Sequence, residues 1–271
     1  MMNFENDLHA IAKLYKSDKL DHGYIEVYDS YFKKIKDKEL KILEIGIADG
    51  QSLLIWSDYF KNSIIVGIDI HKIDVEEKNL NKKNIRVHQG SQSDKKFMNE
   101  IINQYGNFDI IIDDGSHISK DVKKSFHLLF PILNNKGLYV VEDMQTSYNH
   151  FFGGNSFDLK YSNTHMNFFK NLTDRLNYQE IANPFYTTKD YDAQITNISF
   201  YHNLVFVRKG LNNTASKEVL NHSYEDMKFQ EKSARTGNKL RYYLKYKIFY
   251  KLYTYLLFIL YFIKKIILFR F

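Results

Sequence analysis

Short apolar runs alternate with amphipathic segments through the first 210 residues of the chain. The runs are rich in β-branched side chains and bounded by turn residues, which is typical of buried parallel strands. They fall at residues 41–46, 63–69, 84–90, 108–112 and 137–141. Between them, helical spacing of apolar residues predicts helices near residues 53–60, 97–105 and 122–129. This alternation predicts a doubly wound α/β fold with a mostly parallel, Rossmann-like sheet.

The segments on either side complete the predicted fold. Residues 5–36 show a helical apolar pattern that a polar cluster at residues 17–24 interrupts. We expect an inter-helix turn at this cluster, and a flap over a ligand is the alternative. Residues 160–185 predict another helix. Residues 195–208 predict two strands around a tight turn, which brings the sheet to seven strands and makes the last one antiparallel.

Changes in composition divide the chain into four expected parts. Residues 1–40 form an N-terminal helical cap and residues 41–210 form the cofactor-binding domain. Residues 211–238 are polar and lack periodicity, which is typical of a linker. Residues 239–271 combine basic and aromatic residues and predict a C-terminal amphipathic helix.

The positive charge of the chain lies in this C-terminal tail. After Glu231 there are ten basic residues and no acidic one, so a net charge of +6 for the whole chain leaves −4 for residues 1–231. The body is therefore not expected to bind nucleic acid. The apolar run at residues 252–263 is short for a membrane span and favours an in-plane anchor on an anionic membrane surface. Packing on the body or on a partner subunit is the alternative.

Two absences in the sequence bear on the compartment. The chain contains no Cys, which excludes disulfides, thiolate metal sites and a Cys nucleophile. The N-terminus has no basic region followed by an apolar run, so no signal peptide is predicted. We expect a cytoplasmic protein that the tail holds at the inner face of the cytoplasmic membrane.

A strand, a glycine-containing turn and a helix follow one another at residues 41–60. The turn, from Glu44 to Gly50, has the spacing Glu-x-Gly-x-x-x-Gly, which is looser than the Gly-x-Gly-x-x-Gly turn of dinucleotide sites. An acid beside a loose turn suits a cofactor with an amino-acid end, such as S-adenosylmethionine (SAM); an NAD-type oxidoreductase is the alternative. Asp69 ends the next strand about 20 residues later and would hold a ribose diol in either case. The polar loop at residues 91–94 suits an adenine edge.

Two of the predicted strands end in acidic residues. Asp113-Asp114-Gly115-Ser116-His117 follows one strand and Glu142-Asp143 follows the next. Ligands of open α/β sheets bind beyond the carboxyl ends of the strands, so these side chains are expected to meet. Carboxylates beside an imidazole predict a metal and general-base site. The alternative is a set of loop and cap acids with a histidine at a helix start.

Taken together, these motifs resemble the SAM-dependent sugar O-methyltransferases of the macrolide-tailoring type, the mycinamicin and tylosin enzymes. The likeness covers about residues 5–210 and is carried by Leu43–Leu53, Gly90–Asp94, Ile112–His117, Val141–Tyr148, Ser17–Tyr24 and Ser199–Phe206. Those enzymes carry a long N-terminal assembly domain that this chain is expected to lack. Its oligomeric state therefore stays open, with a homo-oligomer among the partners considered.

The resemblance implies a role for each matching residue. Asp114, Glu142 and Asp143 would hold Mg²⁺, and His117 would be the catalytic base. The residues that would line the cofactor pocket are Glu44, Gly46, Ile47, Gly50, Ser52, Asp69, Ile70, Ser91, Gln92, Asp113 and Tyr24.

The resemblance also implies a reaction, the Mg²⁺- and SAM-dependent methylation of a sugar hydroxyl. The acceptor sugar would be nucleotide-linked, lipid-linked or part of a glycan. The membrane-facing tail favours a role in capsular polysaccharide or glycolipid synthesis. A non-catalytic membrane-associated scaffold is a further alternative.

Overall fold

The computed structural model describes residues 8–181, 185–189, 191–213, 252, 255, 256 and 259–263. The chain divides into two compact units, residues 1–176 with 190–212, and residues 177–189 with 213–271. Most of the predicted linker and tail lies outside the described residues. The described tail residues are helical and their side chains are exposed. Within the described part of the chain, no helix has the length and apolar character needed to cross a membrane.

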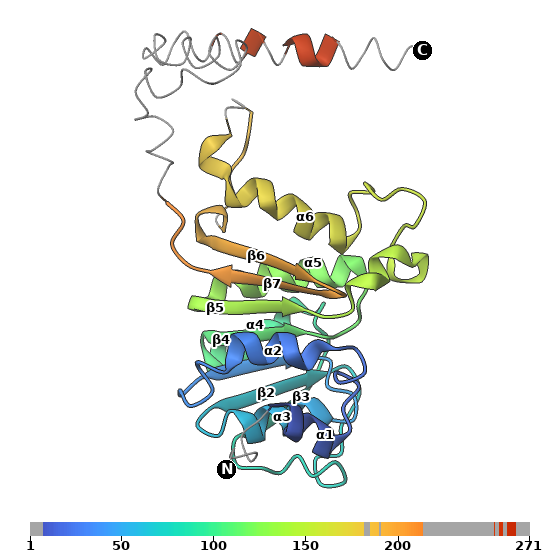
Figure 1. The fold of residues 1–271 in the computed structure, drawn as a ribbon, viewed down its shortest axis with the longest axis vertical. Helices are drawn as coiled ribbons and strands as arrows, with labels where there is room; N and C mark the ends of the chain where they lie inside the picture. Colours follow the sequence, from blue (N-terminus) through green and yellow to red (C-terminus); the bar gives the residue numbers. More distant parts are fainter. Residues whose placement is uncertain are drawn as a thin grey trace. The chain divides into compact units, whose positions relative to one another are not determined.

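A seven-stranded sheet forms the centre of the first unit (Figure 1). Its strands are β1 (Lys41–Ile45), β2 (Ile64–Asp69), β3 (Ile85–Gln89), β4 (Phe108–Asp113), β5 (Leu133–Val141), β6 (Ile195–Tyr201) and β7 (Leu204–Lys209). They lie in the order β3-β2-β1-β4-β5-β7-β6. β1 to β5 are parallel, and β7 runs antiparallel to both of its neighbours. The predicted doubly wound, mostly parallel sheet with an antiparallel last strand is confirmed.

Helices cover both faces of this sheet (Figure 1). On one face lie α1 (Leu8–Tyr15), α2 (Tyr24–Phe32) and α3 (Gln51–Tyr59). On the other lie α4 (Lys95–Tyr105), α5 (Ser119–Leu129) and α6 (His165–Leu176). The 3₁₀ turns are η2 (Phe130–Ile132), η3 (Met144–Tyr148), η4 (His150–Phe152), η5 (Tyr178–Glu180) and η6 (Asp192–Gln194).

Each face of the sheet has its own hydrophobic core. Side chains alternate along a strand, so neighbours such as Ile42 and Leu43 join different clusters. Trp56, the single tryptophan, is fully buried in the α1–α3 core, and its ring lies 5.1 Å from that of Tyr28. Phe126 is fully buried in the core beneath α4–α6.

Two element boundaries differ from the prediction. α6 begins at His165 because Thr164 caps it: the Thr164 hydroxyl accepts a hydrogen bond from the backbone N–H of Asn167. It ends at Leu176 and is therefore shorter than the predicted 160–185. β5 begins at Leu133, earlier than predicted, because Leu133 already pairs with β4 before a shift in register.

The order of the strands reverses between β1 and β4. The chain passes from β1 to β2 and β3 on one side, and from β4 to β5 on the other. A ligand crevice forms beyond the carboxyl ends of the strands at such a switch point. The acidic ends of β4 and β5 and the glycine turn after β1 all lie at this edge.

Candidate active site

Two cavities open beyond the carboxyl ends of β1, β2 and β4, each with a volume of about 490 Å³. Residues that line both are Gly46, Asp69 and Gly115. Of the predicted cofactor residues, the first cavity is also lined by Ile47 and Ser52, and the second by Ile70, Ser91 and Gln92. The two cavities thus meet at the glycine turn that the sequence indicated.

The glycine after β1 allows two loops to touch. Gly46 has a φ of 79°, and a Cβ added to it would lie 2.2 Å from the backbone carbonyl oxygen of Asp114. Any side chain here would push the loop after β1 away from the loop after β4. Gly46 therefore fixes the position of Asp114 relative to both cavities.

Asp69 holds the loop after β1 from the side of β2. Its Oδ2 accepts hydrogen bonds from the backbone N–H groups of Ile47 and Ala48 at 3.0 and 3.1 Å. Its Oδ1 accepts one from the N–H of His71 at 2.8 Å. The carboxylate consequently lies where the two cavities join.

Four of the predicted cofactor residues are buried rather than exposed in a cavity. They are Tyr24, Glu44, Gly50 and Asp113. The Glu44 carboxylate accepts a hydrogen bond from the hydroxyl of Ser52 at 2.8 Å, so it orients a side chain that lines the first cavity. Gly50 has a φ of 80° and starts α3.

Asp113 lies beneath the second cavity. Its Oδ1 accepts a hydrogen bond from Gln92 Nε2 at 3.0 Å, and its Oδ2 accepts one from the hydroxyl of Tyr139 at 3.1 Å. The Gln92 Oε1 accepts the N–H of Ser116 at 2.7 Å. Burial raises the pKa of Asp113 to about 7, although the bonds from Tyr139 and Gln92 act in the opposite direction. Asp113 thus orients Gln92, which lines the cavity.

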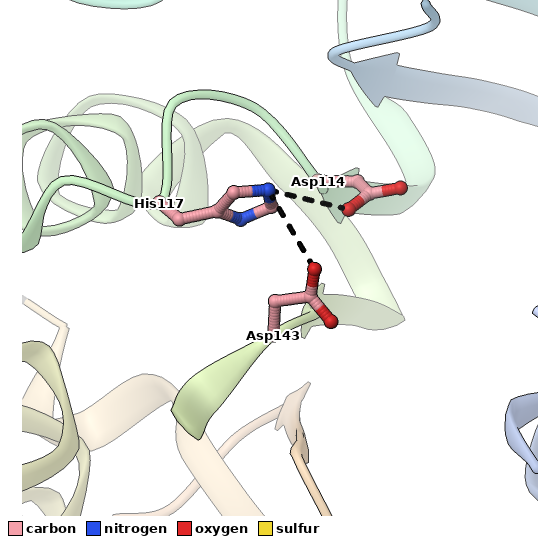
Figure 2. Close-up of side chains that lie close together, drawn as sticks. All are labelled: Asp114, His117 and Asp143. Carbon is pink, nitrogen blue, oxygen red and sulfur yellow. Dashed lines mark ion pairs between the residues drawn. The ribbon is translucent and has the colours of Figure 1, made fainter. Parts of the chain in front are cut away.

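Asp114, His117 and Asp143 point toward one another in the first cavity, and we call them the outer group (Figure 2). His117 Nε2 lies 4.0 Å from Asp114 Oδ1 and 3.7 Å from Asp143 Oδ2. One ligand atom of each residue lies within 4.8 Å of the other two. His117 and Asp143 have left-handed φ angles of 54° and 51°. Such conformations are uncommon and cluster at functional sites.

Each aspartate of the outer group has one oxygen anchored and the other facing His117. Asp114 Oδ2 accepts a hydrogen bond from the ammonium group of Lys19, and Asp143 Oδ1 accepts one from the hydroxyl of Tyr24, both at 2.8 Å. Burial acts to raise the pKa of Asp143, but the hydrogen bond from Tyr24, with further effects of Gln145 and the nearby His117, brings it below its usual value. Two carboxylate oxygens held apart in this way fit Mg²⁺, a hard cation that takes oxygen ligands.

Glu142 belongs to a deeper set of carboxylates, Glu44, Asp114 and Glu142, which we call the inner group. One oxygen of each lies within 4.8 Å of the other two. Lys19 Nζ lies 2.6 Å from Glu142 Oε1 and 2.8 Å from Asp114 Oδ2. The structure thus brings Asp114 and Asp143 together with His117 and turns Glu142 toward Lys19. The assignment of Glu142 to the metal stays a prediction.

Lys19 and Tyr28 are site residues to which the sequence analysis gave no role. The hydroxyl of Tyr28, on α2, donates a hydrogen bond to Glu142 Oε1 at 2.6 Å. Lys19 lies in the turn between α1 and α2, within the motif that spans residues 17–24. This segment is a turn, as expected, and it also lines the first cavity. The position of Lys19 within this motif was a sign that it belongs to the site, but the spacing of residues did not show that its side chain points inward.

Ser119 and His165 form a buried pair where α5 meets α6. His165 Nδ1 lies 3.0 Å from the hydroxyl oxygen of Ser119. Burial, with smaller effects from His117 and Lys123, lowers the pKa of His165 to about 4. The imidazole is therefore neutral in the folded protein at pH values where a solvated histidine is charged.

This depressed pKa predicts a pH dependence of stability. Below pH 6.5 the unfolded chain binds a proton at His165 that the folded chain does not bind until about pH 4. We expect the free energy of unfolding to lose about 3 kcal/mol through this residue as the pH falls from 6.5 to 4. Urea titrations at several pH values should show a smaller loss in His165→Gln than in the native chain. Equal losses in both would contradict this.

Comparison with known proteins adds the relatives of this chain. A family model described as FtsJ-like methyltransferase matches residues 15–173. The chain is 36% identical over 216 residues to the mycinamicin VI 2''-O-methyltransferase of Micromonospora griseorubida, and equally to the demethylmacrocin O-methyltransferase of Streptomyces fradiae. These alignments cover 76% of this chain but 53% and 54% of the relatives. The chain thus spans about half the length of the curated relatives it matches. The resemblance predicted from the motifs is confirmed.

Solved structures agree with this similarity. The MycE methyltransferase from the mycinamycin biosynthetic pathway, in complex with Mg and S-adenosylhomocysteine (SAH), has a TM-score of 0.74 and 34% identity. The comparison covers 82% of this chain and 58% of that chain. The same enzyme with Mg, SAH and mycinamycin VI has a TM-score of 0.73 and 33% identity, with the same coverage. These enzymes share the fold described above.

Proposed function

This chain belongs to the FtsJ-like methyltransferase family, and on that premise we propose that it is a SAM- and Mg²⁺-dependent O-methyltransferase acting on a sugar hydroxyl. The observation that carries the proposal is the outer group, in which two carboxylates and an imidazole converge at the switch point of the sheet. The relatives named above support the reaction class, and the Mg and SAH in the MycE complexes support the cofactors.

The two cavities suit the two ends of the methyl donor. Ser91 and Gln92 would face the adenine in the second cavity, and Asp69 would hold the ribose where the cavities join. Ser52, oriented by Glu44, would face the methionine end in the first cavity. This arrangement would direct the methyl group toward the outer group.

A sugar hydroxyl is a weak nucleophile at neutral pH and needs a proton acceptor. His117 Nε2 faces the first cavity and would take the hydroxyl proton as the oxygen attacks the methyl carbon. The new O–C bond forms as the S–C bond of the donor breaks, so SAH leaves with a neutral sulfur and the proton stays on His117. Asp114 and Asp143 would stabilise the imidazolium and hold Mg²⁺, which supplies Lewis acidity at the hydroxyl.

The segment after Asp143 would receive the acceptor. Tyr148 and Phe151 are 41% and 80% exposed in this segment, and the half-buried ring of Phe152 lies 6.4 Å from that of His117. An exposed apolar surface next to a polar site is typical of a binding surface. It would contact an acceptor that carries apolar groups beside its sugar. The basic tail favours an acceptor at a membrane, in surface polysaccharide or glycolipid synthesis.

The test is transfer of a labelled methyl group from SAM to three acceptors: a nucleotide sugar, a lipid-linked sugar and an extracted surface glycan. We expect label in one of them, only with Mg²⁺, and a mass increase of one methyl group per modified sugar. A thermal-shift comparison of SAM with NAD is the control for the oxidoreductase alternative. Stabilisation by NAD and not by SAM would contradict the proposal.

A further inference from the structure

The first turn of α6 is bonded to two loops that follow different strands of the sheet. The loop after β4 carries His117, and the loop after β5 carries Asp143. We propose that Ser119 and Ser147 are positioning residues, which hold these two loops at a fixed separation through the first turn of α6. The consequence for catalysis rests on the proposed function, because His117 and Asp143 act there as base and metal ligand.

Two buried serine hydroxyls accept hydrogen bonds from this turn. The hydroxyl oxygen of Ser119, the first residue of α5, accepts the backbone N–H of His165 at 3.3 Å. The hydroxyl oxygen of Ser147, on η3, accepts the backbone N–H of Met166 at 3.0 Å. Each serine is 1% exposed. The N–H groups of a first helical turn have no partner within their own helix, so they can bind other elements of the protein.

Each bond begins close to a member of the outer group. Ser119 follows His117 by two residues, and Ser147 follows Asp143 by four. The bond from Ser119 has a second contact beside it, because the hydroxyl oxygen also lies 3.0 Å from Nδ1 of the fully buried His165. A shift of either serine would therefore be passed along a short stretch of backbone to the site.

Both loops contain a residue whose conformation needs support from its surroundings. His117 and Asp143 have left-handed φ angles of 54° and 51°, which persist only where the surrounding structure over-determines them. Thr146 links the loops directly, since its hydroxyl oxygen lies 2.7 Å from the carbonyl oxygen of Asp143 and 3.4 Å from that of His117. A hydroxyl has one proton, which the shorter contact uses. The bonds to α6 add the support that this long contact does not give.

α6 itself is held in place by the core. Its residues Phe169 and Leu172 are buried in the cluster beneath α4–α6. The rings of Phe168 and Phe169 lie 5.4 and 5.3 Å from that of Phe126 on α5. Close packing of this kind resists displacement, so α6 gives both loops a common fixed reference.

The kinetic test removes each hydroxyl in turn. We expect Ser119→Ala and Ser147→Ala each to lower the single-turnover rate of methyl transfer about 10- to 10²-fold, because a displacement of about 1 Å can cost about 10²-fold. The affinity for SAM should not change, because neither serine lines the two cavities described above. The double variant should lose less than the product of the single effects, because one substitution already unlinks the loops. Native rates in both single variants would overturn the inference.

Ser63→Ala is the matched control. Ser63 is 2% exposed, and its hydroxyl accepts the N–H of Leu40 and donates to the carbonyl oxygen of Lys38, both at 3.1 Å. It directly precedes β2 and so lies at the edge of the sheet opposite to the site. We expect a loss of thermal stability similar to that of the other two variants, with a native rate. An equal loss of rate in Ser63→Ala would reduce the effect to general destabilisation and contradict a positioning role.

Hydrogen exchange, followed by mass spectrometry, tests the link without any measurement of activity. In Ser119→Ala we expect faster amide exchange at residues 143–149 as well as at 115–119, and in Ser147→Ala the same two segments should respond. Each variant tests the same link, so one suffices if the other does not fold. Faster exchange only in the loop that bears the substitution would show that α6 does not link the loops. If both loops respond but the native chain methylates no acceptor, the link stands and the proposed function fails.

Discussion

Replacing His117 with glutamine is expected to lower the rate of methyl transfer by about 10²- to 10⁴-fold, the range that a positioned general base contributes. The affinity for SAM should not change, because His117 lines the first cavity and not the second, where Ser91 and Gln92 are proposed to face the adenine. Glutamine keeps a polar side chain of similar reach but cannot take up a proton. The measurement is single-turnover release of SAH, with SAM binding followed separately by calorimetry.

His150→Gln is the matched control for this experiment. His150 lies on η4, in the same segment after β5, and its side chain is exposed. It is an imidazole near the site that does not belong to the outer group. At saturating acceptor we expect its variant to turn over like the native chain, so that an effect of this segment on acceptor binding is separated from an effect on the chemical step. Native activity in His117→Gln would exclude His117 as the base.

Replacing Asp143 with asparagine should lower activity on the order of 10²-fold or more, since a metal contributes several kcal/mol of charge stabilisation and each 1.36 kcal/mol is a factor of ten. The amide oxygen can still accept the hydrogen bond from Tyr24, which leaves the amide nitrogen facing His117 in place of a carboxylate oxygen. The variant should fold, bind SAM and lose affinity for Mg²⁺. The measurement is the rate of methyl transfer at a series of Mg²⁺ concentrations, and a sample with EDTA gives the rate without the metal.

Asp18→Asn controls for a general loss of negative charge at this cavity. Asp18 is exposed and lines the first cavity, but it is outside the outer and inner groups. It should keep the native dependence on Mg²⁺. A native chain that is fully active in EDTA would contradict the metal assignment, and an Asp143→Asn chain with native Mg²⁺ affinity would move the site elsewhere.

The sheet and the place of the site were predictable because both depend on local patterns. Apolar runs that end in acids specify parallel strands with carboxylates at one edge, which locates Asp114 and Asp143 before any contact is known. The glycine turn after β1 and the acid that ends β2 follow from the same reasoning. The sheet was confirmed, and the roles of the individual residues stay predictions.

The division of the acidic residues into an inner and an outer group could also have been derived from the alternation of side chains along each strand. Val140 faces the α1–α3 core and Val141 the α4–α6 core, so Glu142 returns to the side of α1–α3. By the same alternation along β4, Asp113 faces the side of α5 and Asp114 faces the side of Lys19. The sequence analysis treated the four acidic residues as one cluster and did not take into account that successive side chains of a strand face opposite sides of the sheet.

The role of Lys19 could not be predicted from local sequence. Its partners Asp114 and Glu142 lie 95 and 123 residues further along the chain. Neighbouring Lys16 is exposed, and nothing in the spacing distinguishes the two lysines. The direction of a side chain in a turn depends on tertiary packing, here of α1 and α2 against the sheet.

The carboxylate of Asp114 is shared between an ammonium group on one side and the outer group on the other. A change of charge near Asp114 Oδ2, on the buried side, would therefore alter the electrostatic environment of Asp114 Oδ1, on the side of His117. The effect would pass through one carboxylate group, without movement of the backbone. The affinity of the proposed metal site would thus depend on the charge balance in the interior of the protein as well as on the residues of the outer group.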